Sequence, residues 1–134
     1  MVEDRTTDGK RIAQLLSSEV SSREDSGLDG LEVVNADADV EPSADGELAY
    51  EIAFREDGDE TTDGDDGDAV LAEVYVHDER VRVEFRERVD AAADAAEEVG
   101  LRVRPKAVRP PRTLVFVEDG AEVKRATDVF VAVL

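Results

Sequence analysis

Two neighbouring stretches of the chain have an apolar residue at every second position, and this alternation restricts the fold more than any other feature. In residues 70–76, Val and Ala alternate with Leu, Glu and Tyr, and in residues 80–86, Val and Phe alternate with Arg and Glu. Successive side chains of a strand point to opposite faces of a sheet, so this period predicts two strands buried on one face. Residues 77–79 form the turn of the predicted hairpin.

Further strands are predicted from similar patterns. Residues 47–54 alternate in the same way, and Leu48 is expected on the same face as Tyr50, Ile52 and Phe54. Residues 101–107 begin as a strand, but Pro105 cannot donate a ladder hydrogen bond, so this strand is expected at a sheet edge. Residues 114–117 are apolar on both faces, which favours a strand inside the sheet.

Two helices are predicted, and two segments stay ambiguous. The first helix begins after an N-cap at Thr7 or Asp8 and runs to about Ser22, and the second covers residues 87–99. Residues 31–36 suit a short strand, either inside or outside the sheet, and the tail 121–134 suits either a helix or a strand. The sum is an α+β fold, a mostly antiparallel sheet of about five to six strands with two to three helices packed on one face. Its element order resembles that of secretion-chaperone-like domains.

The chain length favours one domain over residues 1–134. Residues 1–7 are expected to fray, and the low-complexity acidic stretch 56–68 is predicted to be a mobile loop. There is no cysteine, so neither disulfides nor thiolate metal sites are available. No apolar run approaches the length of a membrane span, and we expect a cytoplasmic protein without membrane association.

The chain is strongly acidic, with 35 Asp and Glu residues against 16 Lys and Arg residues and a net charge of -19. Residues 1–100 hold 31 of the acids and 9 of the bases, whereas residues 101–134 hold 4 acids and 7 bases. Carboxylates keep a surface hydrated, and molar salt shortens the Debye length to about 3 Å, which mutes their mutual repulsion. We therefore predict a salt-adapted protein whose folding depends on salt.

Two stretches of the chain carry a family resemblance. They are TDGKRIAQLLSSEV at residues 7–20 and GLRVRPKAVRPPRTLVFVEDGAEVKRATDV at residues 100–129. Together with the acidic residues between them, they resemble a family of small uncharacterised acidic proteins of halophilic archaea. This resemblance extends over nearly the whole chain and implies no activity, ligand or catalytic residue.

Residues 101–112 are the most unusual stretch, because they contain five bases and no acid. The bases are Arg102, Arg104, Lys106, Arg109 and Arg112. One interpretation is internal pairing with acids on the outward faces of other strands, where an opposite-charge pair contributes about 0.2–1 kcal/mol. The acids in position for this pairing are Glu47, Glu51, Glu73 and Glu84.

Two further interpretations give the basic stretch a partner. The first is a protein partner or a second copy of the chain. The second is RNA or DNA, because arginine binds phosphates well. Counterion release weakens phosphate binding steeply as salt rises, and the nearest aromatic residue, Phe116, is predicted to lie in the core rather than to stack on bases.

No residue pattern specifies a reaction. The acidic loop lacks the glycine that an EF-hand starting at Asp57 needs at its sixth position, so no calcium site is predicted. His77, the single histidine, is predicted as a turn residue, and neither a phosphate-binding loop nor a dinucleotide fingerprint is present. We expect no catalytic residue, metal or cofactor. The prediction is a non-catalytic interaction or assembly module that uses residues 101–112, with a nucleic-acid-binding protein as the alternative and a small enzyme third.

Overall fold

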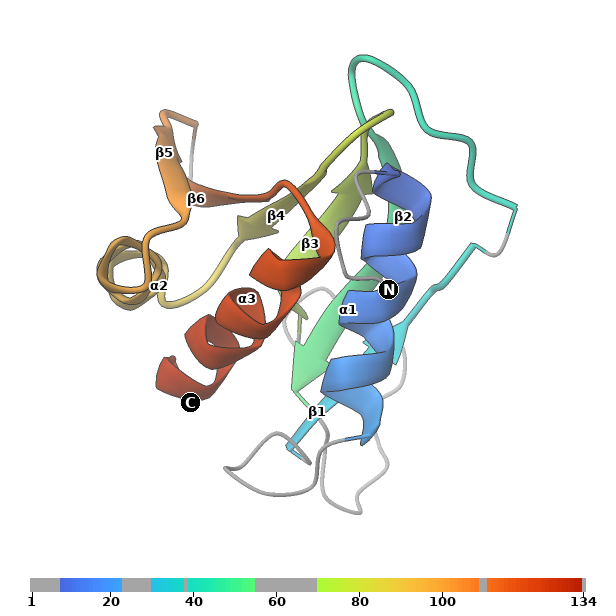
Figure 1. The fold of residues 1–134 in the computed structure, drawn as a ribbon. Helices are drawn as coiled ribbons and strands as arrows, with labels where there is room; N and C mark the ends of the chain where they lie inside the picture. Colours follow the sequence, from blue (N-terminus) through green and yellow to red (C-terminus); the bar gives the residue numbers. More distant parts are fainter. Residues whose placement is uncertain (1–7, 23–29, 38, 55–69, 109–110, 134) are drawn as a thin grey trace.

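The computed structural model describes residues 8–22, 30–37, 39–54, 70–108 and 111–133. These residues form three helices and a six-stranded antiparallel sheet, which confirms the predicted α+β fold (Figure 1). The helices are α1 (Gly9–Ser22), α2 (Val89–Glu98) and α3 (Gly120–Ala132). The strands are β1 (Leu31–Val34), β2 (Glu47–Phe54), β3 (Val70–Val76), β4 (Val81–Phe85), β5 (Arg102–Lys106) and β6 (Arg112–Val117). The segments 1–7 and 56–68, for which fraying and mobility were predicted, lie outside the described residues.

The strands lie in the order β1-β2-β3-β4-β6-β5, and each is antiparallel to its neighbours. The segment 31–36 therefore contributes an edge strand, because Leu31–Val34 pairs with β2. The strand that contains Pro105 forms the opposite edge, as its missing donor predicts. Strand β6 lies between β4 and β5, as its apolar residues on both faces indicate.

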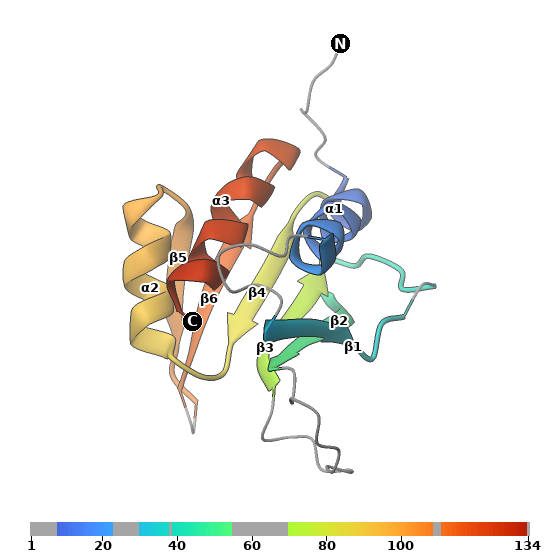
Figure 2. The ribbon, with the colours of Figure 1, turned by 90° about the horizontal axis from the view of Figure 1, so that it is seen from below.

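The helices cover one face of the sheet, and α3 packs against both α1 and α2 (Figure 2). The tail is thus helical. Asp119 caps α3, since its carboxylate accepts a hydrogen bond from the backbone N–H of Glu122 at 3.0 Å. Phe130 is buried on the inner face of α3, with its ring centroid 5.1 Å from that of Phe85 on β4. Packing of this aromatic pair favours the helix over a further strand.

One face assignment was wrong. Leu48 is 39% exposed, whereas Ala49 and Tyr50 are buried. The register of β2 against β3 shifts between Leu48 and Tyr50. An extra residue in one strand reverses the faces on which the preceding side chains point, so Leu48 lies on the face away from the helices.

The start of α1 is held against the turn between β3 and β4. Asp8 caps the helix by accepting a hydrogen bond from the backbone N–H of Lys10 at 3.1 Å. Gly9 donates its N–H to the carbonyl of Asp78 at 3.0 Å, and a Cβ at this glycine would lie only 1.9 Å from the carbonyl oxygen of His77. A side chain at position 9 would therefore separate the helix from the turn. Within the described residues, no helix has the length and apolarity that crossing a membrane requires.

Candidate functional site

The sheet face that points away from the helices, called the outer face below, brings acids and bases from five strands together. Residues directly opposite each other on neighbouring strands share a face. One such row runs across the sheet through Glu51, Glu73, Glu84, Leu114 and Arg104. Three carboxylates in adjacent positions repel one another, so the row requires cations nearby.

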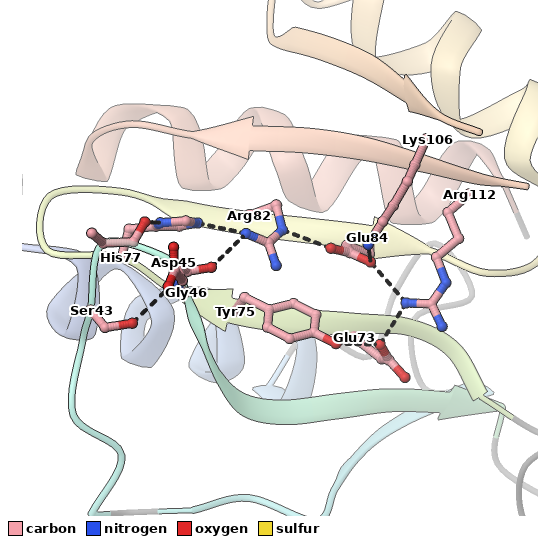
Figure 3. A network of polar contacts seen from close by, with 11 residues as sticks. Ser43, Asp45, Gly46, Glu73, Tyr75, His77, Arg82, Glu84, Lys106 and Arg112 are labelled. Carbon is pink, nitrogen blue, oxygen red and sulfur yellow. Dashed lines mark hydrogen bonds and ion pairs between the residues drawn. The ribbon is translucent and has the colours of Figure 1, made fainter. Parts of the chain in front are cut away.

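Two of those cations, Arg112 and Lys106, come from the basic stretch. The guanidinium of Arg112 donates to Glu73 and Glu84, in each case at 2.8 Å (Figure 3). Arg82 donates through Nε to the other oxygen of Glu84 at 2.7 Å, and Lys106 Nζ lies 3.4 Å from the carboxylate. We call these five side chains the Glu84 network. It joins β3, β4, β6 and β5 across the outer face.

The Glu84 network holds its charges in place. Glu84 is only 1% exposed, and this burial opposes its ionisation. The hydrogen bonds from Arg112 and Arg82 outweigh the burial, so the pKa of Glu84 lies below its ordinary value. Burial by itself lowers the pKa of Arg112, but the hydrogen bonds to Glu84 and Glu73 raise it by more. The pKa of Arg112 therefore lies above its ordinary value. Tyr75 donates its hydroxyl to Glu73 at 2.7 Å, and burial together with this bond raises the pKa of Tyr75 to about 12.

His77 extends the Glu84 network toward the turn. Arg82 donates to His77 Nε2 at 2.9 Å and to the carbonyl of Asp45 at 3.2 Å. With Nε2 accepting, the ring proton lies on Nδ1, which is 3.0 Å from the carbonyl of Ala44. Burial and the charge of Arg82 lower the pKa of His77 despite the bond to Ala44. The histidine thus starts the turn, as predicted, and also binds the network, which the sequence did not indicate.

Gly46 makes this histidine contact possible. It has a φ of +90°, and a Cβ there would lie 2.9 Å from both His77 Nε2 and an Arg82 nitrogen. The segment before β2 can therefore close over the imidazole only with glycine at this position.

The predicted internal pairing is present for two of the basic residues. Lys106 and Arg112 bind the acids of the Glu84 network, whereas Glu47 and Glu51 bind Ser43 and Asn35. No buried side-chain nitrogen or oxygen lacks a hydrogen-bond partner in the part of the chain that the structure describes. The Glu84 network is therefore a satisfied structural element.

A different arrangement surrounds Phe116 at the other end of the β5–β6 pair. A hollow of about 190 Å³ is lined by Arg80, Arg102, Val103, Arg104 and Phe116, and we call it the arginine hollow. The guanidinium carbons of Arg80 and Arg102 lie 5.4 and 5.9 Å from the centroid of the Phe116 ring. Phe116 was predicted to lie in the core. It instead lies half-buried on the outer face, because its register partners Arg82 and Arg102 point there.

The arginine hollow has more bases than acids. Arg102, whose side chain is 63% exposed, pairs with Glu118 at 3.0 Å. Neither Arg80 nor Arg104 has an acid partner among the residues that the structure describes. The hollow therefore keeps a surplus of positive charge in a protein whose net charge is -19.

Four of the five predicted site residues divide into two groups. Lys106 and Arg112 belong to the Glu84 network, and Arg102 and Arg104 line the arginine hollow. Arg109 lies outside the described residues. Sequence reasoning missed Arg80, which precedes β4 and reaches the hollow only through the pairing of β4 with β6. The one indication in the sequence that Arg80 belongs to a site was its charge next to a predicted turn.

A second hollow, of about 360 Å³, lies between α1 and the segment that leads into β2. Tyr50 lines it, but its hydroxyl already donates to the carbonyl of Ala13 at 2.7 Å. In the described ranges, no group of three or more His, Cys, Asp or Glu side chains is arranged to hold a metal ion. The outer face is therefore the stronger candidate for a functional surface.

Comparison with known proteins places the chain in a family. It belongs to the family of unknown function DUF7993, which matches residues 1–134. No curated protein and no solved structure matches the chain.

Proposed function

We propose that this protein is a non-catalytic interaction module that binds a protein partner through the outer face of β5 and β6. The observation that carries the proposal is the arginine hollow. It exposes Arg104 and Arg102 around a half-buried aromatic ring, and two of its three arginines have no acid partner in the described part of the chain. The Glu84 network, by contrast, has satisfied its charges within the protein.

The composition of this surface supports a protein interface. Arginine and aromatic residues are enriched at interface centres and supply most of the binding energy. Phe116 and Leu114 offer apolar area on β6, and the arginines surround the ring. An apolar centre with cationic neighbours suits a partner that presents an acidic surface.

The face supports binding better than the edge of the sheet does. An exposed edge strand can pair with a strand of another chain, and proteins prevent this with proline and charged residues. Pro105 is the fourth of the five residues of β5, and Arg102, Arg104 and Lys106 lie on the same strand. A homodimer formed by extension of the sheet is therefore disfavoured, and contact through the face is favoured.

A salt-rich cytoplasm remains part of the proposal. The net charge of -19 supports it, because such a charge needs screening for the fold to stay compact. The same salt favours a protein partner over RNA or DNA. An interface with an apolar centre persists in concentrated salt, whereas a phosphate-backbone interface loses affinity.

The test is capture of partners from a lysate in about molar potassium chloride, with salt chosen to screen the acidic surface. Wild-type protein is compared with an Arg102→Glu/Arg104→Glu variant, with and without nuclease. The matched control is Lys124→Glu/Arg125→Glu, which changes charge equally on exposed residues of α3. We expect a nuclease-resistant protein that the control retains and the hollow variant loses.

Other outcomes would overturn the proposal. Loss of the captured material on nuclease treatment would replace the protein partner by a nucleic acid. Equal capture by all three proteins would show that the arginine hollow is not the binding surface. Recovery of the chain alone would leave self-association, which sedimentation of the wild type and the hollow variant would measure.

A further inference from the structure

We infer that the arginine hollow is a binding site for one phosphate group. The inference names the chemical group that a ligand presents at this site. For the biological role of the site, it rests on the proposed function. Arg80 and Arg104 are the main binding residues. Arg102 completes the site, and Phe116 forms its apolar side.

The charge balance of the arginine hollow matches a dianion. Its three guanidiniums bring three positive charges, and the carboxylate of Glu118 neutralises one of them at Arg102. Two positive charges remain. A phosphate monoester carries about -1.5 to -2 near neutral pH, so it balances this surplus, whereas one further carboxylate would leave half of it.

The shape of the hollow also fits a single compact group. Its volume of about 190 Å³ is below the roughly 300–1,000 Å³ of sites that enclose a whole small molecule. The arginines approach it from different directions, since Arg102 and Arg104 lie on edge strand β5 and Arg80 precedes β4. A tetrahedral anion presents oxygens on several sides, and the planar fork of each guanidinium can bind two of them.

Phe116 prepares the site before a ligand arrives. Its ring lies within 6 Å of the guanidinium carbons of Arg80 and Arg102. Cation–π contact at this distance restrains two long side chains that would otherwise lose more conformational freedom on binding. The apolar ring also excludes water from one side of the site, which strengthens charge-assisted hydrogen bonds.

Free phosphate and the phosphate group of a modified side chain share this chemistry. The experiment therefore uses two probes, inorganic phosphate and O-phosphoserine, at the lowest potassium chloride concentration at which circular dichroism reports a complete fold. Acetate at equal ionic strength provides a planar carboxylate for comparison. The measurement is the chemical shift of the arginine Nε–H groups during titration of ¹⁵N-labelled protein.

We expect saturable shifts at Arg80 and Arg104 with phosphate and much smaller ones with acetate. Arg80→Gln and Arg104→Gln should each weaken phosphate binding about tenfold or more, because each removes charge-assisted hydrogen bonds. Arg104→Lys keeps the charge but loses the fork, so it should weaken binding by a smaller factor. The matched control Arg125→Gln, on an exposed residue of α3, should bind as wild type does.

Two results would overturn the site. One is unchanged phosphate binding by an Arg80→Gln/Arg104→Gln variant that circular dichroism shows to be folded. The other is equal saturable binding of acetate, which would reduce the hollow to a general carboxylate contact. Stronger binding of O-phosphoserine than of phosphate would assign the source to a modified side chain, and the reverse would assign it to the free ion.

Because no partner is needed for this titration, the site and the proposed function can fail separately. Phosphate binding without a captured protein would support the site and count against the interaction module. A captured protein that depends on Arg102 and Arg104, with no phosphate binding, would support the module and overturn the site.

Discussion

The outer face of the sheet carries two groups of arginines that differ in how closely acidic side chains neutralise them. In the Glu84 network, Arg112 and Arg82 contact carboxylates at 2.7–2.8 Å, and the central acid is 1% exposed. In the arginine hollow, Arg104 has no acid partner in the described residues, and Arg102 has a solvent-exposed one. Both groups draw on the same acid-free stretch, residues 101–112.

The difference separates charges that stabilise the fold from charges that are free to bind a ligand. A buried carboxylate whose cations are removed keeps its desolvation cost. Removal of one side chain from the Glu84 network should therefore lower the free energy of unfolding strongly. An exposed guanidinium is already hydrated, so its removal leaves no buried partner behind. We therefore expect the network to affect stability and the hollow to affect binding, and four measurements test this contrast.

The largest effect is expected from Arg112→Leu. The substitution removes two 2.8 Å contacts and leaves Glu84 buried with fewer cations. It should lower the free energy of unfolding by about 3 kcal/mol, as for a broken buried pair. The matched control Arg104→Leu should change it by less than about 0.5 kcal/mol. Urea unfolding at one fixed salt concentration measures both, and equal losses would contradict the contrast.

A smaller loss is expected from Gly46→Ala. The new Cβ would meet His77 and Arg82 at 2.9 Å in a backbone conformation with φ of +90°, which side chains rarely adopt. We expect a loss of about 2 kcal/mol from strain and from the displaced Arg82–His77 contact. Gly30→Ala is the control, since no atom of the described residues lies within 4 Å of the Cβ that it would add, and it should stay within about 0.5 kcal/mol of wild type. A wild-type melting curve for Gly46→Ala would show that the contact does not restrain the turn.

The next test sharpens the contrast through pH. Burial lowers the pKa of His77 from 6.5 in the folded protein, so folding favours the neutral ring. The contribution to stability is complete above 6.5 and is lost as pH falls from there through the folded-state pKa. His77→Gln should therefore lose less stability than wild type between about pH 7.5 and about pH 5.5. Arg104→Leu should lose as much as wild type, since it leaves His77 and the contacts of its ring unchanged.

Glu84 adds a second acid-dependent loss at lower pH. Its pKa is lowered from 4.5, so its contribution is present above that value and is lost as pH falls through the folded-state pKa. A wild-type unfolding series that stayed flat on acidification from pH 7 would contradict the roles assigned to both Glu84 and His77.

The smallest effect on stability is expected from Glu118→Gln. Its pair with Arg102 is exposed, at 38% and 63% for the two side chains, and such pairs contribute less than about 1 kcal/mol. Removing the carboxylate raises the surplus charge of the hollow, so phosphate binding should tighten about threefold. Weaker phosphate binding in this variant, measured by the same titration, would contradict the charge balance proposed for the hollow.

Much of the fold could be predicted from local patterns in the sequence. Alternation predicted β3 and β4, the cap at Asp8 predicted α1, and Pro105 predicted an edge strand. The tail was not decided locally, because its residues suit both a helix and a strand. Its helical form depends on the cap at Asp119 and on the burial of Phe130 against β4.

Only part of the candidate site could be predicted from the sequence. The acid-free stretch indicated where cations gather, but it could not assign each cation a role. The bulge after Leu48 and the outward position of Phe116 also depend on strand register. A one-residue shift exchanges the two faces of a strand, so no local pattern reveals it.

By itself, the sequence determined the acidity of the chain, its alternating strands and the concentration of bases between residues 101 and 112. Only the tertiary structure decided which of those bases are paired. Arg112 contacts acids 28 and 39 positions away, whereas Arg104 lies opposite Leu114. The physical reason is that the energy of a charge pair depends on distance and burial, and both are set by how distant strands align.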